Sequence, residues 1–237
     1  MSIVSVIIPV FNREKFIVDI LTLLKKQNYR PLEVIVVDDA SSDNTVAEIN
    51  SFIKNNSDKQ FNLFLYKNKN NKGACYCRNY GIYNSNGKYI QFLDSDDFLH
   101  IDKINKQVKS LENNNSKLAI SDYQYVKNNK VIKECKNNGN LFKRTSLGWS
   151  IYTSSPLIDS SLIKKKLNWN EKIHFLQDKD FLFKVLMLSG EYIYVPGYTS
   201  YYAQHSEKQI SDLYSVKKPQ FFTIIYSRIS FLMSNIF

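Results

Sequence analysis

The first hundred residues alternate between short, continuously apolar runs and stretches in which apolar residues recur every three or four positions. A continuous apolar run predicts a buried strand, and the three-to-four spacing predicts a helix. The predicted strands are 3–10, 32–37, 61–66 and 89–93, and the predicted helices are 15–27, 45–55 and 75–84. This strand–helix repeat is typical of a parallel sheet with crossover helices.

Beyond residue 100 the repeat weakens. We expect a helix at 101–111, a strand at 118–126, a lysine-rich connection at 131–140, a turn cluster at 153–156, a helix at 177–188, a short strand at 192–196 and a polar segment at 201–211. The fold class is therefore α/β, with one open, twisted, mostly parallel, Rossmann-like sheet flanked by helices and an extension that adds to it after residue 100.

Polar residues gather where three of the predicted strands end. The clusters are Phe11–Asn12, Asp38–Asp39 and Asp94–Asp97. Ligands of parallel sheets bind beyond the carboxyl ends of the strands. We therefore expect the three clusters to meet in one crevice.

The cluster Asp94-Ser95-Asp96-Asp97 places three carboxylates in four positions. In an extended chain Asp94 and Asp96 point to the same side, where their charges repel unless water or a cation separates them. Oxygen ligands of this kind suit Mg²⁺ or Mn²⁺. The alternative is a solvated turn in which Asp97 caps a helix that begins near His100.

Composition narrows the range of partners. The chain has 237 residues, 43% of them hydrophobic and 23% charged, with a formal net charge of +10 and a pI near 9.3. This charge favours an anionic partner, such as a nucleic acid, an acidic membrane surface or a phosphorylated substrate. The three cysteines include no CxxC pair, so we expect no disulfide framework or zinc site and a cytoplasmic location.

Five separated segments, in order, resemble glycosyltransferase family 2, whose members are inverting enzymes of GT-A fold that use nucleotide-diphospho-sugars. The segments are Pro9–Asn12, Val37–Thr45, Asn71–Gly73 with Arg78–Gly81, Asp94–Asp97, and Gln177–Asp178. The resemblance implies a nucleotide-sugar-binding half at 1–100 and an acceptor-binding half of the same domain at 101–215. An amphipathic C-terminal helix is expected at 216–237.

The resemblance also implies which residues bind the donor. They are Pro9, Phe11, Asn12, Asp39, Asn71, Lys72, Gly73, Arg78, Asp94 and Ser95. Asp39 would accept a hydrogen bond from the base, as uracil offers, and Phe11 would cover its face. Arg78 suits a charge-assisted contact with the phosphate or base. The alternatives are that Asp38 and Asp39 cap the next helix and that Phe11 belongs to the core.

Asp96 and His205 are the implied ligands of Mn²⁺ or Mg²⁺, with Asp94 on the ribose or on the ion's water shell. The implied catalytic base is Asp178, with Asp180 as the competing candidate. Gln177 departs from the family pattern, which has Glu at this position. The alternative role for Asp178 is a helix cap.

We therefore predict a metal-dependent, inverting glycosyltransferase that moves one sugar from a UDP-sugar to a glycan or lipid-linked acceptor in surface-polysaccharide synthesis. Processive relatives carry a Gln-x-x-Arg-Trp motif, and this sequence has none. The alternatives are a nucleotidyltransferase, which needs a glycine-rich loop after the first strand, and a nucleic-acid-binding module. Because the basic residues are dispersed, we expect no nucleic acid partner.

The last segment, 216–237, is apolar after a basic start at Lys217–Lys218, and Arg228 is the one charge from residue 221 on. One interpretation is peripheral contact with the inner face of the membrane. The other is packing on the enzyme's own core or on a second subunit.

Overall fold

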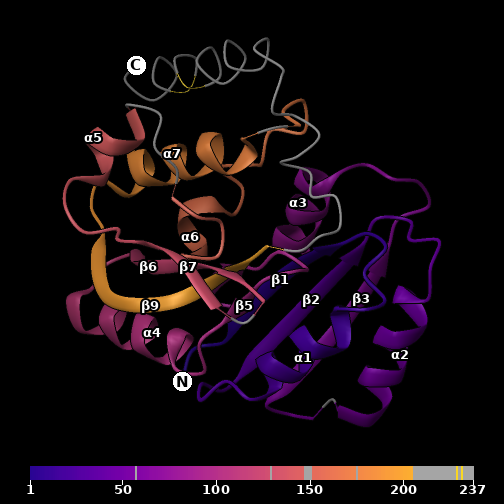
Figure 1. Cartoon of the computed structure of the whole chain (residues 1–237). Helices are drawn as coiled ribbons and strands as arrows, with labels where there is room; N and C mark the ends of the chain where they lie inside the picture. The colour runs from indigo at the N-terminus through magenta and orange to yellow at the C-terminus, as the bar shows by residue number, and fades with distance from the viewer. Residues whose placement is uncertain are drawn as a thin grey trace.

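The computed structural model describes residues 1–56, 58–128, 130–146, 151–174, 176–204, 228 and 231 (Figure 1). The predicted metal ligand His205 and, apart from Arg228 and Phe231, the segment 216–237 lie outside these residues. The elements of the first hundred residues are β1 (Val4–Val10), α1 (Ile17–Lys25), β2 (Leu32–Asp38), α2 (Thr45–Asn56), β3 (Phe61–Lys67), α3 (Ala74–Asn84), β4 (Tyr89–Phe92) and β5 (Phe98–Leu99). Those that follow are α4 (Lys103–Asn114), β6 (Leu118–Lys127), β7 (Lys130–Cys135), α5 (Leu141–Ser146), β8 (Pro156–Asp159), α6 (Ser160–Ile163), α7 (Gln177–Ser189) and β9 (Ile193–Ala203).

The first four strands form the predicted parallel sheet. Their order is β3-β2-β1-β4, and each neighbouring pair is parallel. Every residue of β1, β2 and β4 is buried, as expected for strands covered on both faces. The helices α1, α2 and α3 cross between these strands where the apolar spacing predicts them.

The later strands continue the same sheet. β8 lies antiparallel between β4 and β6, and β9 runs parallel to β6, so the order ends β8-β6-β9-β5. The fold class is confirmed as a mostly parallel curled sheet flanked by helices.

Two predictions in this half are wrong. The connection expected at 131–140 contains strand β7, which pairs with the C-terminal half of β6 and is exposed along most of its length. A strand without a buried face carries no apolar alternation that could have revealed it. The strand expected at 192–196 is much longer, because β9 continues through Pro196 and Gly197 into the predicted polar segment. The two-residue strand β5 was not predicted.

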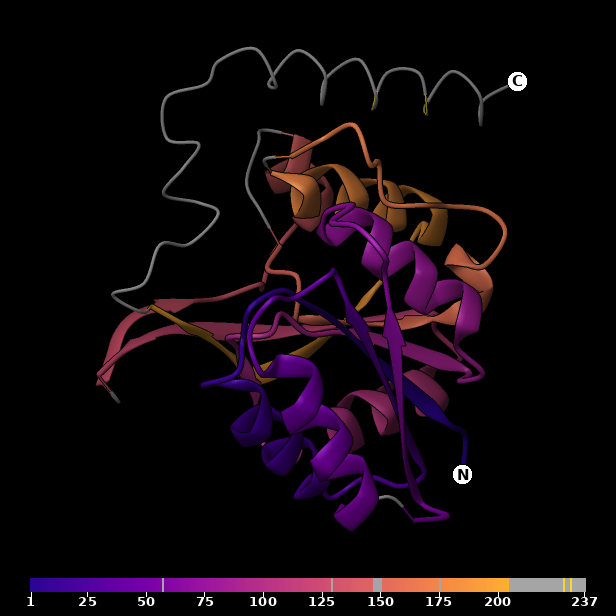
Figure 2. The ribbon, with the colours of Figure 1, turned by 90° about the vertical axis from the view of Figure 1, so that its right-hand side faces the viewer.

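Two layers of helices cover the sheet (Figures 1 and 2). Alternate residues of β1 face opposite cores: Val6 and Ile8 belong to the cluster that contains residues of α1, α2 and α4, whereas Ile7 belongs to the cluster that contains residues of α3, α6 and α7. The helices with the predicted donor and base residues, α3 and α7, therefore lie on the same side of the sheet.

Gly81 lets α3 approach the sheet closely. A Cβ atom at this position would lie 2.4 Å from Cγ2 of Ile7 on β1, a distance that side chains do not adopt. The glycine of the segment Arg78–Gly81 therefore has a packing role. No helix among the described residues is long and apolar enough to cross a lipid bilayer.

Candidate active site

The loops after β1, β2 and β4 meet, because these strands are adjacent and parallel. The backbone N–H of Asn12 donates to Oγ of Ser41 at 2.9 Å, and the N–H of Ser42 donates back to Oδ1 of Asn12 at 2.9 Å. Arg13 extends from the first loop to the third, with Nη2 3.6 Å from Oδ2 of Asp96. The convergence predicted from the strand ends is confirmed.

Asp39 holds the loop that precedes α3. Its Oδ1 accepts from the N–H of Lys72 and from the side-chain amide of Asn68, both at 2.8 Å, and its Oδ2 accepts from the N–H of Gly73 at 2.7 Å. Asp39 is only 4% exposed. The side chain of Cys77 is also hydrogen-bonded to this carboxylate. The carboxylate oxygens of Asp39, which were predicted to bind the base, therefore also hold the loop before α3.

The helix-capping alternatives for the second cluster are wrong. Asp43 caps α2, since its Oδ1 accepts from the N–H of Thr45 at 3.0 Å. Asp38 instead accepts from the N–H of Ser41 at 3.1 Å and closes the turn after β2. The signal for this arrangement was in the sequence, because Asp43 stands two residues before the helix and Asp38 stands seven.

The other predicted donor residues differ in accessibility. Pro9 is buried inside β1, whereas Phe11 is 44% exposed, which overturns the alternative that placed it in the core. Asn71 and Lys72 are exposed, and Nζ of Lys72 lies 4.2 Å from the ring centroid of Tyr76. Gly73 adopts a φ of 87°, a conformation that favours glycine, directly before α3.

Arg78 links the two ends of the site. Its Nη2 donates to Oδ1 of Asp94 at 2.7 Å, and its Nη1 donates to Oε1 of Gln177 at 3.1 Å. The guanidinium also lies over the ring of Trp169, 4.3 Å from the centroid. A loop after β4 and the first residue of α7, 83 residues apart in the chain, are therefore connected through one buried arginine. Sequence reasoning found Arg78 and Gln177 separately and missed both the link and Trp169.

The remaining carboxylates after β4 have different environments. Asp96 is partly exposed, and Ser95 is buried between it and Asp94. Asp97 is 1% exposed and accepts hydrogen bonds from the hydroxyl of Tyr152 and the N–H of Ala203. Burial, reinforced by the charges of Asp96 and Asp94, raises the pKa of Asp97 well above its usual value. The alternative that Asp97 caps α4 is wrong, because Asp97 instead fastens this loop to β9.

The first turn of α7 carries both candidate bases. Burial is the main cause that raises the pKa of Asp178, and the charge of Asp94 adds to it. Asp180 is 1% exposed and forms an ion pair with Nζ of Lys184 at 2.8 Å. Because Asp180 is already paired and enclosed, it is poorly placed to accept a proton from a substrate.

A sequence profile described as "Glycosyl transferase family 2" matches residues 5–185. The chain belongs to this family. Membership decides the choice among the three functions left open by the sequence in favour of glycosyl transfer. The resemblance drawn from the five segments is thereby confirmed.

Curated relatives and solved structures agree with this family. A stretch of 130 residues is 34% identical to the Escherichia coli protein named UDP-Glc:alpha-D-GlcNAc-diphosphoundecaprenol beta-1,3-glucosyltransferase WfgD. The matched stretch covers 55% of this chain and 49% of that protein. This glycosyltransferase spans between a fifth and a half of the length of several such relatives.

The fold is shared with two solved glycosyltransferases. Staphylococcus aureus TarS 1-349 in complex with UDP-GlcNAc matches with a TM-score of 0.78 and 22% identity over 94% of this chain and 64% of that one. Mannosyltransferase PcManGT from Pyrobaculum calidifontis, in complex with GDP-Man and Mn2+, matches with a TM-score of 0.66 and 18% identity over 96% and 69%.

The carboxylates that follow β4 are ligands of the kind that suits a hard divalent cation. In the part of the chain that the structure describes, no group of three or more His, Cys, Asp or Glu side chains is arranged to hold a metal ion. Asp94 and Asp96 nevertheless place two partly exposed carboxylates on one loop beside the crevice. A cation such as Mg²⁺ takes one or two carboxylates and completes its shell with water and substrate phosphates.

Proposed function

We propose that this chain is a metal-dependent, inverting glycosyltransferase that transfers one sugar from a UDP-sugar to a hydroxyl group of a glycan or lipid-linked acceptor. The observation that carries the proposal is the Arg78 bridge, because it brings Asp94 on the donor side and Gln177, next to Asp178, to one side chain. The two halves of a displacement site thus face one crevice.

On the donor side, the residues have separate tasks. The carboxylate of Asp39 accepts the imide N–H of uracil, and exposed Phe11 offers an apolar surface to the same ring. Asn12, Ser95 and the loop Asn71–Gly73 form the polar wall around the ribose and phosphates. The names of the relatives support a UDP donor, since WfgD is named for UDP-Glc and TarS binds UDP-GlcNAc.

Asp94 and Asp96 would hold Mn²⁺ or Mg²⁺, with His205 as a further ligand. When bound, the cation offsets the negative charge that develops on the departing nucleoside diphosphate. Because Asp94 is held by Arg78 at 2.7 Å, its carboxylate has a fixed orientation before the donor arrives. That orientation serves to place the anomeric carbon between the diphosphate and the first turn of α7.

Asp178 acts as the general base. Its carboxylate takes the proton of the acceptor hydroxyl, the hydroxyl oxygen forms a bond to the anomeric carbon, and the bond from that carbon to the diphosphate oxygen breaks on the opposite side. This in-line path inverts the configuration. A raised pKa makes a carboxylate a stronger base, which suits a role near neutral pH.

The test is a screen of nucleotide sugars for hydrolysis and transfer with Mn²⁺ or Mg²⁺, repeated with Asp178→Asn. We expect turnover with a UDP-sugar, and a loss in the variant of about 10²- to 10⁴-fold in kcat with UDP binding retained. Asp180→Asn is the control for the neighbouring carboxylate and should retain more activity than Asp178→Asn. Full turnover in Asp178→Asn would refute the assignment of the base.

We also propose peripheral membrane contact through 216–237, in keeping with a lipid-linked acceptor. The name of WfgD, which contains a diphosphoundecaprenol acceptor, supports this class of acceptor. Removal of residues 216–237 should reduce sedimentation with liposomes of bacterial lipids. Unchanged sedimentation would refute membrane contact and favour the protein-packed arrangement.

A further inference from the structure

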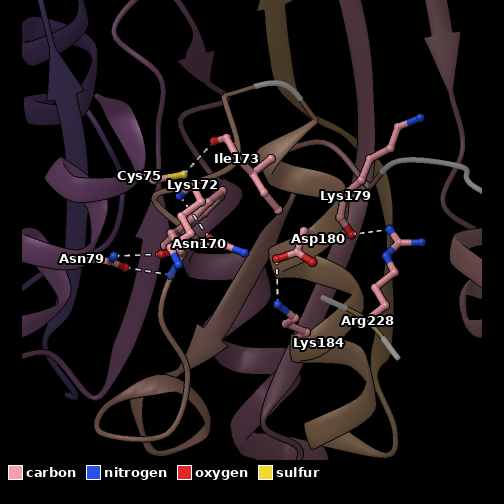
Figure 3. Close-up of polar contacts among 10 residues, drawn as sticks. Cys75, Asn79, Asn170, Lys172, Ile173, Lys179, Asp180, Lys184 and Arg228 are labelled. Atoms are coloured by element: carbon pink, nitrogen blue, oxygen red, sulfur yellow. Dashed lines mark hydrogen bonds and ion pairs between the residues drawn. The ribbon is translucent and has the colours of Figure 1, made fainter. Parts of the chain in front are cut away.

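Arg228, near the C-terminus, joins the helices α5 and α7. Figure 3 shows its contact with Lys179 on α7. Its Nη2 donates to the backbone carbonyl oxygen of Lys179 on α7 at 2.6 Å, and its Nη1 donates to the carbonyl oxygen of Thr145 on α5 at 3.2 Å. The guanidinium also lies over the ring of Phe183, 4.6 Å from the centroid. One side chain therefore ties the first turn of α7 to α5.

Phe231, three residues further on, reaches the same helix. It packs against the core cluster that contains residues of α7 and α3, and Nζ of Lys184 lies 5.9 Å from its ring centroid. Lys184 is the partner of Asp180. The two described residues of the C-terminal segment thus both contact α7.

The first turn of α7 is weakly held by the helix itself. Leu176, the residue before the helix, has a φ of 58° and makes no side-chain capping hydrogen bond. The backbone hydrogen bond from the N–H of Asp180 to the carbonyl oxygen of Leu176, which opens the helix, is long at 3.4 Å. A left-handed conformation at a leucine is unfavourable and persists only when neighbouring contacts hold it. The turn that carries Asp178 therefore depends on contacts from outside the helix.

Two nearby carboxylates compensate the charge of Arg228 at this position. A cation near a helix N-terminus is disfavoured by the helix dipole, so it needs compensating negative charge. Burial lowers the pKa of Arg228, and the carboxylates of Asp180 and Asp178 counteract this effect. The guanidinium is therefore within the electrostatic reach of both candidate bases while it is bonded to the residue between them.

We propose that Arg228 is a positioning residue that fixes the first turn of α7 and thereby aims the carboxylate of Asp178 at the acceptor hydroxyl. The proposal rests on the proposed function for the role of Asp178. Arg228 acts through its hydrogen bond to the carbonyl oxygen of Lys179, the residue next to Asp178.

The test compares Arg228→Gln with Arg30→Gln in the full chain. Arg30 is a close chemical match, because it also donates to backbone carbonyl groups, those of Lys25, Gln27 and Tyr29. It also lies over a phenylalanine ring, Phe61, at 5.6 Å. Arg30 follows α1, away from the site, so its variant reports the general cost of losing such an arginine.

Arg228→Gln should lower kcat by about 10- to 100-fold while the KM for the donor and the affinity for UDP stay unchanged, since a small misplacement of a catalytic group has an effect of this size. Arg30→Gln should lower the melting temperature by a similar amount and leave kcat unchanged. Arg228→Lys, which keeps the charge and can reach one carbonyl oxygen, should recover part of kcat.

Amide hydrogen exchange gives a readout that does not need a known substrate. Exchange in the peptide 177–189 should be faster in Arg228→Gln than in the wild type and unchanged in Arg30→Gln. The proposal would be overturned if exchange in this peptide were as slow in Arg228→Gln as in the wild type, or if Arg228→Gln lost no more kcat than Arg30→Gln. If no nucleotide sugar is turned over by the wild type but exchange still responds, the proposed function fails while the structural part of the inference stands.

Discussion

The ion pair of Arg78 and Asp94 gives the sharpest quantitative test of how the site is held together. The two atoms lie 2.7 Å apart, and the side chains are 7% and 28% exposed. With an effective dielectric constant of about 20, a charge pair at this distance gains roughly 6 kcal/mol before desolvation. Removing one partner of a buried pair costs about 3–5 kcal/mol. Because water still reaches Asp94, we expect Arg78→Gln to lose about 3 kcal/mol of unfolding free energy.

The assay is urea unfolding of Arg78→Gln, Asp94→Asn and the double variant, which together isolate the interaction between the two side chains. We expect a coupling energy of about 2 kcal/mol and, for Arg78→Gln, a melting temperature lower by about 6–12 °C. The matched control is the pair Arg13 and Asp96, whose atoms lie 3.6 Å apart with side chains 23% and 20% exposed. This looser pair should show a coupling of at most about 1 kcal/mol. Equal coupling in both pairs would refute the reasoning that Arg78 fixes Asp94.

Three further predictions follow from packing and from the raised and lowered pKa values. Gly81→Ala should lose about 1–3 kcal/mol in urea unfolding, and less in an Ile7→Ala background, because the new Cβ meets Cγ2 of Ile7. Burial lowers the pKa of Lys103 in the folded protein, whereas the pKa of an unfolded lysine is about 10.4. The unfolded state therefore binds more protons, and the free energy of unfolding should rise with pH up to about 10.4. The variant Lys103→Met should lose this dependence. Asp178 works as a deprotonated base and its pKa is raised, so kcat should fall on acidification with a midpoint above about pH 3.9. A midpoint at or below this pH would contradict the role of Asp178.

The buried network around Lys103 explains why its pKa is lowered. Nζ donates to the side-chain oxygens of Gln91 and Gln107, both at 2.5 Å, and the lysine is fully buried. Neutral amide oxygens accept hydrogen bonds but supply no opposite charge, so the charged form carries most of the cost of desolvation. A pH-independent difference between wild type and Lys103→Met would contradict this account.

The sheet of the first hundred residues could be predicted because its signals are local. β1 and β2 are apolar at nearly every position, and Asp39 and Asp94 follow strand ends that topology brings together. β7 could not be predicted, because a strand exposed on both faces has no pattern that separates it from a loop. The extent of β9 was hidden by Pro196 and Gly197, which normally mark the end of a strand.

The site was predicted as residues but not as contacts. Asp178 and Arg78 could be named from short segments, whereas the hydrogen bond from Arg78 to Gln177 joins positions 99 residues apart. The bond from Tyr152 to Asp97 spans 55 residues, and no local pattern marks either partner. Such pairings depend on how α7 and β9 settle on the sheet, which hydrophobic spacing does not specify.

The most direct test of the central claim is calorimetric titration of UDP, with and without Mn²⁺, into the wild type, Asp96→Asn and Asp178→Asn. We predict Mn²⁺-dependent binding of UDP in the wild type and in Asp178→Asn, and loss of that dependence in Asp96→Asn. Wild-type, Mn²⁺-dependent affinity in Asp96→Asn would show that the end of β4 does not hold the cation and the diphosphate.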